Sequence, residues 1–441
     1  MNTSDTIAAP ASAIGGAVTV IRVSGSNAEA VGNAVWQGRR KLDAECARRM
    51  LLGKVGDDPA LAVFMPGPHS YTGDDVVELQ CHGGAAAAAN AMRRLLAAGC
   101  RLAEPGEFTY RAFVNGKLDL LQAEAVADLV AAGSQAALEL AARQLEGSLS
   151  RTVDRLWEDV AALRAECESR LDFPDEELDF DPDVPAKIAD CVARVDALIA
   201  SGQAGKLIRD EVRVVLAGRP NVGKSSLLNR ISGYDRAIVS AIPGTTRDTV
   251  DSGAVIRNIQ IRLTDTAGLR RSDDPVEKLG IERSLRSIRA GEITLWLLDA
   301  SAPDLAAECA ALDKNAPGVI AVWNKCDLAP DAALPDLDVP QVRISAATGE
   351  NMEALFDAVE SRVCSGQRMT LPETAVNARS AALLEQAKTS LLRAKTAFEA
   401  ADHELAALEL AAANRQIGGI TGKNVEPDLL DRIFHRFCIG K

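Results

Sequence analysis

Residues 218–225 have the types and the spacing needed to hold a phosphate group. A short apolar run precedes Gly218, and Gly223, Lys224 and Ser225 complete the pattern G-x-x-x-x-G-K-[ST]. Glycines let successive backbone N–H groups converge on one anion, and the helix that follows adds the positive end of its dipole. We expect Lys224 to reach the outer phosphates of a nucleotide and the Ser225 hydroxyl to bind Mg²⁺. The alternative is a strand-to-helix turn that binds nothing.

Four further motifs follow in the chain, each after a segment with the composition of a strand. They are Gly244-Thr245-Thr246-Arg247-Asp248, Asp265-Thr266-Ala267-Gly268, Asn324-Lys325-Cys326-Asp327 and Ser345-Ala346-Ala347. Any one of them is common by chance. Their order and their positions at strand ends together indicate a GTP-binding domain.

These motifs supply complementary chemistry. A threonine hydroxyl of the first can complete Mg²⁺ coordination, while Asp265 can hold the ion through water and the Gly268 N–H can meet the γ-phosphate. The Asp327 carboxylate can accept both donors on the N1–N2 edge of guanine, a pair that adenine lacks. Residues 345–347 can offer backbone N–H groups to the base.

Hydrolysis of a nucleotide also needs a group that orients the attacking water. The residue after Gly268 is Leu269, whose side chain cannot do so. The group must come from elsewhere. The nearby candidates are Glu277, Glu282, Arg247 and Arg270.

The composition is that of a globular protein with several cores. The chain has 441 residues, 47% of them hydrophobic and 25% charged, which predicts roughly three domains. No segment is long and apolar enough to span a bilayer, and Met1–Pro10 lacks the features of a secretory signal. Nine cysteines without a Cys-x-x-Cys pair suit reduced thiols in the cytoplasm.

The net charge of −13 argues against a broad basic surface for nucleic acid. Any contact with RNA would therefore have to be made by a local patch.

The elements that must position the motifs form three kinds of segment. Residues 1–118 are mixed α+β, residues 119–210 and 366–441 are helical, and residues 211–365 alternate strands with helices as in a doubly wound α/β domain. Strands are expected at Val18–Val23, Leu61–Phe64, Val76–Cys81, Val212–Ala217, Gln260–Leu263, Ile293–Leu298, Val319–Val322 and Val342–Ile344. Helices are expected at Ala85–Ala98, Leu120–Leu145, Leu149–Leu171 and Pro185–Ala200, with a boundary at Gly202 and Gly205. We favour insertion of 211–365 into one helical domain over two separate helical domains.

The motifs resemble those of the GTPases that include Era, EngA and the MnmE/TrmE family. Three stretches narrow the resemblance to the MnmE/TrmE family of tRNA wobble-uridine modification GTPases, and it covers essentially the whole chain. They are Asn115–Ala125, Phe173–Glu177 and the terminal Phe437-Cys438-Ile439-Gly440-Lys441. The resemblance implies a Ras-like G domain inserted into a helical domain, after a folate-binding-like N-terminal domain.

The resemblance also implies a potassium-activated GTPase whose G domains dimerise. Asn221, Ser240, Ile242 and Thr245 match the K⁺ site, Ser225 and Thr246 match the Mg²⁺ ligands, and Glu277 matches the water-orienting glutamate. The full set expected at GTP is Asn221, Val222, Gly223, Lys224, Ser225, Ser226, Ser240, Ala241, Ile242, Pro243, Gly244, Thr245, Thr246, Asp265, Thr266, Ala267, Gly268, Asn324, Lys325, Asp327, Ser345, Ala346 and Ala347.

In this family the N-terminal domain dimerises and binds a tetrahydrofolate derivative, 5-formyl or 5,10-methylene. Arg22, Glu78, Lys117 and Lys441 match the positions near the folate. Two features depart from the family pattern: residues 10–18 lack Pro-Gly-x-Gly, and Cys81 stands where a glycine is usual before His82. Without the resemblance, each of the four charged residues would be read as a surface charge.

Cys438 has two interpretations, a thiolate that adds to uracil C6 or a small apolar residue that packs in the tail; we favour the second.

By resemblance, the partners are tRNA and an FAD-dependent MnmG/GidA-like protein in a heterotetramer, and the product carries a carboxymethylaminomethyl or aminomethyl group at C5 of the wobble uridine. The competing interpretation is a ribosome-assembly GTPase switch like Era or EngA. A G-protein scaffold with no role in modification is a third.

Overall fold

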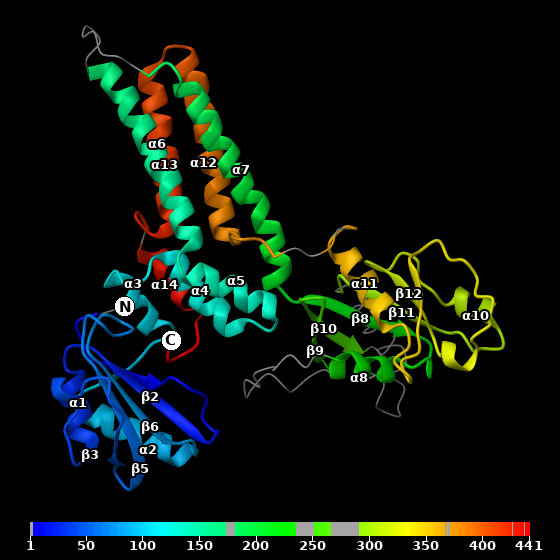
Figure 1. Ribbon diagram of the computed structural model, residues 1–441, viewed down its shortest axis with the longest axis horizontal. Coiled ribbons are helices and arrows are strands. Elements are labelled where there is room, and N and C mark those ends of the chain that lie inside the picture. Colours follow the sequence, from blue (N-terminus) through cyan, green and yellow to red (C-terminus); the bar gives the residue numbers. More distant parts are fainter. Residues whose placement is uncertain are drawn as a thin grey trace, which may run out of the picture. The chain divides into compact units, whose positions relative to one another are not determined.

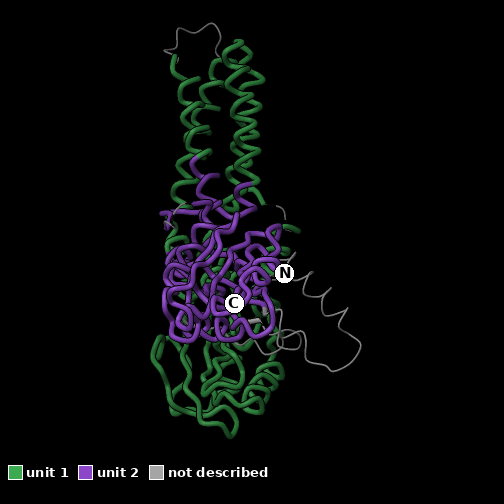
Figure 2. The backbone as a smooth tube through the Cα atoms, turned by 90° about the vertical axis from the view of Figure 1, so that its right-hand side faces the viewer, with its two compact units in different colours: residues 1–130, 143–196, 382–441 green, residues 131–142, 197–381 purple. Residues whose placement is uncertain are grey.

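The computed structural model describes residues 3–172, 181–234, 251–265, 291–366, 368, 371–425, 427–435 and 437–441. Contacts divide the chain into two compact units (Figure 2). The first comprises residues 1–130, 143–196 and 382–441, and the second comprises residues 131–142 and 197–381. Each unit is described by itself below.

The first unit begins with a seven-stranded sheet (Figure 1). Its strands are β1 (Ile7–Pro10), β2 (Val18–Ser24), β3 (Trp36–Gly38), β4 (Leu51–Val55), β5 (Asp58–Met65), β6 (Val76–His82) and β7 (Arg101–Leu102). They lie in the order β3-β4-β5-β6-β2-β1-β7, and only β1 and β7 pair in parallel. Side chains alternate between the two faces of a strand. Val77 and Leu79 of β6 thus face the core beneath α1 (Ala28–Val35) and α2 (Ala85–Ala97), while Glu78 faces the other way.

The predictions for this sheet are confirmed in part. The three predicted strands and the helix at Ala85–Ala98 are present with slightly different ends. Strands β1, β3, β4 and β7 were not predicted, because they are short or contain glycine and carry little β-propensity of their own.

Helices form the rest of the first unit. They are α3 (Glu107–Val114), α4 (Leu120–Ala131), α6 (Ser148–Asp172), α13 (His403–Thr421) and α14 (Pro427–Phe434), with parts of α5 (Gln135–Leu145), α7 (Val184–Arg209) and α12 (Ala378–Glu399). Helices α6 and α13 run side by side (Figure 1), which brings two segments far apart in sequence together.

Two helix predictions were wrong. The expected helix at Leu120–Leu145 is two helices, because residues 132–134 are not helical. The Ser134 hydroxyl accepts a hydrogen bond from the Ala137 N–H and so caps the start of α5. The expected boundary at Gly202 and Gly205 lies inside α7. A Cβ at Gly205 would lie 2.3 Å from Ala375, so the glycine serves close packing rather than helix termination.

The second unit holds a six-stranded sheet in the order β13-β12-β11-β8-β10-β9. The strands are β8 (Val212–Gly218), β9 (Asp251–Ile256), β10 (Ile259–Asp265), β11 (Ile293–Asp299), β12 (Ile320–Asn324) and β13 (Gln341–Arg343). All pairs are parallel except β9 with β10 at the edge. The five predicted strands are confirmed. Continuous apolar runs such as Val214–Ala217 are buried on both faces, as parallel strands are.

Candidate functional site

The loop between β8 and α8 (Lys224–Tyr234) has the backbone that a phosphate site requires. Gly218 and Gly223 have φ values of 132° and 102°, which side-chain-bearing residues rarely adopt. A Cβ at Gly223 would lie 2.2 Å from the Asn324 amide nitrogen. Asn221 also lies in the left-handed region, at φ 63°. The predicted glycines are thus needed both for conformation and for close approach.

Lys224 lies over the interior of this loop. Its Nζ donates to the carbonyls of Gly218 at 2.9 Å and Arg219 at 2.7 Å, and its side chain is buried. A buried ammonium held by loop carbonyls is placed to meet a phosphate anion within the same loop.

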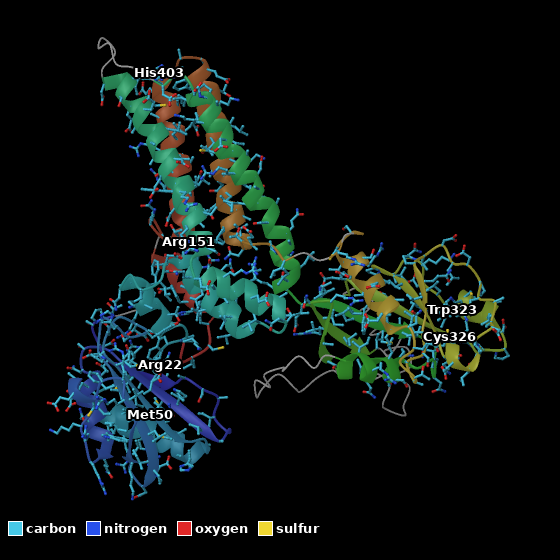
Figure 3. The ribbon with its side chains drawn as sticks, viewed as in Figure 1. Arg22, Met50, Arg151, Trp323, Cys326 and His403 are labelled. Atoms are coloured by element: carbon cyan, nitrogen blue, oxygen red, sulfur yellow. The ribbon has the colours of Figure 1, made fainter. Side chains whose placement is uncertain are left out.

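Asn324 joins three of the predicted motifs. Its Nδ2 donates to the Val222 carbonyl at 2.8 Å, and its Oδ1 accepts from the Ala346 N–H at 2.9 Å. The residue is almost fully buried and is the last residue of β12, directly after Trp323 in the sequence; Figure 3 labels Trp323. One side chain therefore fixes the phosphate loop relative to the turn at 345–347.

The turn at 345–347 has a second support that sequence reasoning missed. Arg230 of α8 donates through Nε to the Ala346 carbonyl at 3.1 Å and through Nη2 to the Ala347 carbonyl. The Ser345 hydroxyl accepts from the Thr348 N–H at 3.1 Å. The helix that begins at the phosphate loop thus also holds the turn expected to meet the base. An arginine one turn before the end of a helix carries no motif by which it could be recognised.

Asp327 is exposed on a 3₁₀ turn (Cys326–Leu328) directly after Lys325, which has a φ of 65°. Lys325 pairs through Nζ with Asp299 Oδ2 at 2.5 Å, at the end of β11. Burial alone would raise the pKa of Asp299, but hydrogen bonds from Lys325 and Ser301 outweigh it and hold that pKa below its usual value. Lys325 is thus held by a carboxylate at the end of the neighbouring strand, while the Asp327 side chain is exposed.

A second ion pair reaches the phosphate loop. Arg219 pairs through Nη1 with Glu308 at 2.9 Å, and the other oxygen of this buried carboxylate accepts from the Asp299 N–H at 3.1 Å. Glu308 therefore connects the start of the phosphate loop to the end of β11. The sequence contains no pattern that marks Glu308, because its role depends only on the fold.

Part of the predicted site lies outside the described residues. These predictions concern Ser240, Ala241, Ile242, Pro243, Gly244, Thr245, Thr246, Thr266, Ala267, Gly268 and Glu277. Asp265 is the last residue of β10 and lies opposite Leu216 of β8, so its backbone reaches the same sheet edge as the phosphate loop.

A second cluster surrounds Arg22 in the N-terminal sheet (Figure 3). Arg22 on β2 pairs with Glu78 on β6 at 2.9 Å, since the two residues are register partners. Its guanidinium lies 5.2 Å from the ring centre of Tyr71 and 5.7 Å from that of Phe108. Burial raises the pKa of Tyr71, whose hydroxyl hydrogen-bonds to Thr109 at 2.8 Å. Sequence reasoning missed both aromatic residues.

The C-terminal tail reaches this cluster. The Gly440 carbonyl accepts from Arg22 Nη1 at 3.5 Å, and the Gly106 N–H donates to the Cys438 carbonyl at 3.4 Å. Gly440 has a φ of 95°, and a Cβ there would lie 2.1 Å from the Pro10 carbonyl oxygen. The two ends of the chain thus meet, with Lys441 next to the residue that contacts Arg22.

For the other residues discussed for this site, the structure gives contacts with neighbours other than Arg22. Lys117 is exposed and donates to the Pro68 carbonyl at 2.9 Å, three residues before Tyr71. Cys81 is buried in the core beside Leu79, on the face opposite Glu78, so this departure from the family pattern does not alter the Glu78 face. The Cys438 thiol is exposed.

The described residues show neither a membrane-spanning helix nor a cluster of metal-binding side chains. No described helix is long and apolar enough to cross a membrane. No group of histidine, cysteine and carboxylate side chains in the described ranges has the arrangement of a metal site. All nine cysteines are free thiols.

Comparisons with known proteins cover the whole chain. The family model described as "MnmE helical domain" matches residues 120–438, and the model "GTP-binding protein TrmE N-terminus" matches residues 6–117. A solved G domain of the FeoB iron transporter of T. maritima covers 35% of this chain and 98% of its own, at 24% identity and a TM-score of 0.25.

Curated relatives match at full length. The tRNA modification GTPase MnmE of Synechococcus sp. (strain JA-3-3Ab) is 44% identical and covers 99% of this chain and 98% of its own. The proteins of that name from Symbiobacterium thermophilum and Geotalea uraniireducens are 42% and 40% identical, with at least 99% of each chain covered. These matches do not favour the Era/EngA-like alternative. The resemblance found in the sequence is confirmed: the chain belongs to the MnmE family of tRNA modification GTPases.

Proposed function

We propose that this chain hydrolyses GTP and that the cycle serves modification at C5 of the wobble uridine of tRNA. The observation that carries the proposal is the Asn324 side chain, which binds the phosphate loop at Val222 and the turn at Ala346 together. The exposed Asp327 beside it is placed for a guanine edge. The names of the full-length relatives support tRNA as the substrate. GTP turnover reorganises the complex and does not itself form the uridine product.

Ions complete the nucleotide site in this proposal. Ser225 follows the buried Lys224 in the first turn of α8, which suits a Mg²⁺ ligand, and Thr246 is its expected companion. Asn221, Ser240, Ile242 and Thr245 are the expected K⁺ ligands. Of these, Asn221 lies among the described residues, and its backbone has a φ of 63°. Bound cations would offset negative charge on the phosphates.

Potassium dependence is the test of the ion site. GTP turnover by the purified chain is measured in K⁺ and in Na⁺ at matched ionic strength. Strong acceleration by K⁺ that is lost in Asn221→Ala supports the site and the G-domain dimer. Equal rates would leave GTP hydrolysis standing and remove the potassium site.

Glu277 is our proposal for the residue that orients the attacking water, since Leu269 cannot. Glu277→Ala is expected to bind GTP normally and to hydrolyse it at least tenfold more slowly, within the roughly 10²–10⁴-fold range of general acid–base groups. Normal turnover would exclude Glu277 from this role.

The N-terminal cluster is our proposal for the site of a tetrahydrofolate derivative, 5-formyl or 5,10-methylene. Arg22, Lys117 and Lys441 would pair with its carboxylates, and Glu78 would accept from the pterin edge. The pairing of Arg22 with Glu78 and with the Gly440 carbonyl supports a common site for three of these residues. Deletion of Lys441 is expected to weaken folate binding in calorimetry and to leave GTP binding unchanged. Intact folate affinity would contradict the role of the tail.

The domain limits and the assembly stay proposals as well. We infer an N-terminal domain at 1–118, a helical domain at 119–210 and 366–441, and an inserted G domain at 211–365; the limits of the family models support the first boundary. We propose a cytoplasmic homodimer that joins an FAD-dependent MnmG/GidA-like partner in a heterotetramer. Loss of the gene should abolish the carboxymethylaminomethyl or aminomethyl uridine, and an unchanged nucleoside profile would favour a scaffold without a role in modification.

A further inference from the structure

The charge of the chain is unevenly distributed. Its net charge is −13, yet residues 36–54 contain six cations and only two carboxylates. The cations are Arg39, Arg40, Lys41, Arg48, Arg49 and Lys54, here called the basic edge. An acidic protein that acts on RNA needs a local surface of this sign, because phosphate contacts dominate affinity for nucleic acid.

The fold gathers these cations at one edge of the N-terminal sheet. Arg39–Lys41 directly follow β3, the outermost strand. Arg48 and Arg49 lie just before its neighbour β4, with Met50 between Arg49 and the strand. Lys54 on β4 is the register partner of Gln37 on β3. Figure 3 labels Met50, which lies between Arg49 and the start of β4.

Cys46 links the two segments, because Arg40 reaches its side chain and a backbone turn leads from Cys46 to Arg49. The Arg40 guanidinium lies 4.0 Å from the Cys46 sulfur, and the Arg49 N–H donates to the Cys46 carbonyl at 3.1 Å. Arg48 is fixed by a hydrogen bond from its Nη2 to the His69 carbonyl at 2.6 Å. The cations therefore form one surface and are not spread along a loose loop.

All six side chains are exposed, and none forms an ion pair with a carboxylate of the described residues. Of the two local carboxylates, Asp43 accepts from the Cys46 N–H and so faces the turn. Many cations elsewhere are paired: Arg164 with Glu168, Arg257 with Asp357, and Lys388 with Asp196. Exposed cations that gather at one edge of a sheet and pair with no described carboxylate are the electrostatic footprint of a nucleic-acid site.

The basic edge also lies within reach of the cluster at Arg22. Four strand spacings separate β3 from β2, which is about 19 Å at the usual spacing of neighbouring strands. An RNA that contacts the edge could thus extend over the same sheet toward Arg22.

We propose that the basic edge binds the phosphate backbone of tRNA. The proposal rests on the proposed function for tRNA as substrate and adds where that RNA docks. Its contacts position the RNA without reading its sequence, as phosphate contacts do. The exposed Met50 and Leu52 nearby would also suit an acidic protein partner, which the experiment below distinguishes.

The test uses the full chain and an unmodified tRNA transcript with uridine at the wobble position, followed by fluorescence anisotropy from 50 to 200 mM KCl. The variant is Arg39→Gln, Lys41→Gln, Arg49→Gln. The matched control is Arg93→Gln, Arg143→Gln, Arg155→Gln, three exposed cations outside the edge with the same total charge change. The edge variant is expected to bind at least tenfold more weakly at 100 mM salt, with the slope of log affinity against log salt reduced by about 2–3.

The control should bind tRNA as the unchanged chain does. Both variants should keep normal GTP affinity and should keep the circular dichroism spectrum and thermal unfolding of the unchanged chain, which shows that the N-terminal sheet folds as well. Equal tRNA affinity and equal salt slope in the edge variant and the control would overturn the proposal. Displacement of tRNA by polyglutamate as effectively as by unlabelled tRNA, at equal charge, would also overturn it in favour of an acidic protein. The nucleoside profile of cells that lack the gene tests the proposed function separately. A lost modification together with unaffected binding would leave that function standing and remove only the docking surface.

Discussion

In the nucleotide site, the contacts of Asn324 join segments that short motifs already mark, at Val222 and Ala346. In the N-terminal cluster, by contrast, the contact between Arg22 and Gly440 joins residues 418 positions apart. The first site is built on one sheet, where parallel strands deliver their carboxyl ends to a common edge. The second exists only when the C-terminal tail has returned to the first strands of the chain.

This difference has a physical consequence. A site supported by a complete sheet keeps its geometry unless one of its own side chains is removed. A site closed by a tail depends on a few contacts of the last residues, which are the part of a chain least restrained by packing. The two sites should therefore respond to different substitutions, and each of the following predictions separates them.

The largest effect is expected for Asn324→Ala. The substitution leaves the buried Val222 carbonyl and the Ala346 N–H without their partner, and each lost bond costs about 1–3 kcal/mol. We expect GTP affinity in calorimetry to fall about a hundredfold, while folate binding stays unchanged. Asn324→Asp keeps the acceptor for Ala346 and should show a smaller loss. Normal GTP affinity in both variants would contradict the role of this side chain.

Asp327→Asn should change which base is bound. The exposed carboxylate would lose an acceptor for guanine, and a bidentate pair contributes about 1–3 kcal/mol of discrimination. Competition binding should show a preference that moves from GTP toward xanthosine triphosphate. Unaltered selectivity would refute the assignment of Asp327 to the base.

Gly440→Ala should affect only the N-terminal site. The added Cβ would lie 2.1 Å from the Pro10 oxygen, so the tail must move away from Arg22. We expect folate affinity to fall about tenfold, the equivalent of 1.4 kcal/mol, and GTP affinity to stay constant. Gly99→Ala is the matched control, because Gly99 has a similar φ of 106° but open space around it. Equal folate affinity in the two variants would show that the tail does not close the site.

The smallest effect is expected in mild acid. A hydrogen bond from Arg101, together with Arg111, holds the pKa of Asp5 below its usual value. Burial would raise the pKa of Glu107, but hydrogen bonds from Arg101 and Arg111 lower it. Because both folded values are depressed, the stabilisation is present above the unfolded pKa of about 4 and is lost as the pH falls through the folded values.

Hydrogen exchange of β1 between pH 5 and pH 3 measures this loss directly. In Glu107→Gln the dependence on pH should be shallower than in the unchanged chain. The same dependence in both proteins would show that this carboxylate does not link acid to the stability of the N-terminal sheet.

The strands of the second sheet, and the residues at their ends, could be predicted from the amino-acid sequence alone. A buried parallel strand must be apolar throughout, and phosphate and guanine chemistry admit few residue types at few spacings. The sequence also determined Arg22 and Glu78 as candidates, although only through the resemblance to a family. Helix ends were predicted less well: the helix expected at 120–145 is interrupted at 132–134, and α7 continues past Gly205. Local helix propensity does not show which segment packs against a glycine.

The partners of these residues depend on the three-dimensional fold. Glu308 and Arg230 carry no motif, and they support the nucleotide site because the fold places them beside Arg219 and Ala346. Tyr71 flanks Arg22 for the same reason. The net charge of the chain did not predict the basic edge. The six cations of this short segment form a surface only because β3 and β4 pair and bring them together. Contacts between residues distant in sequence depend on the packing of the whole chain, and local residue patterns do not encode them.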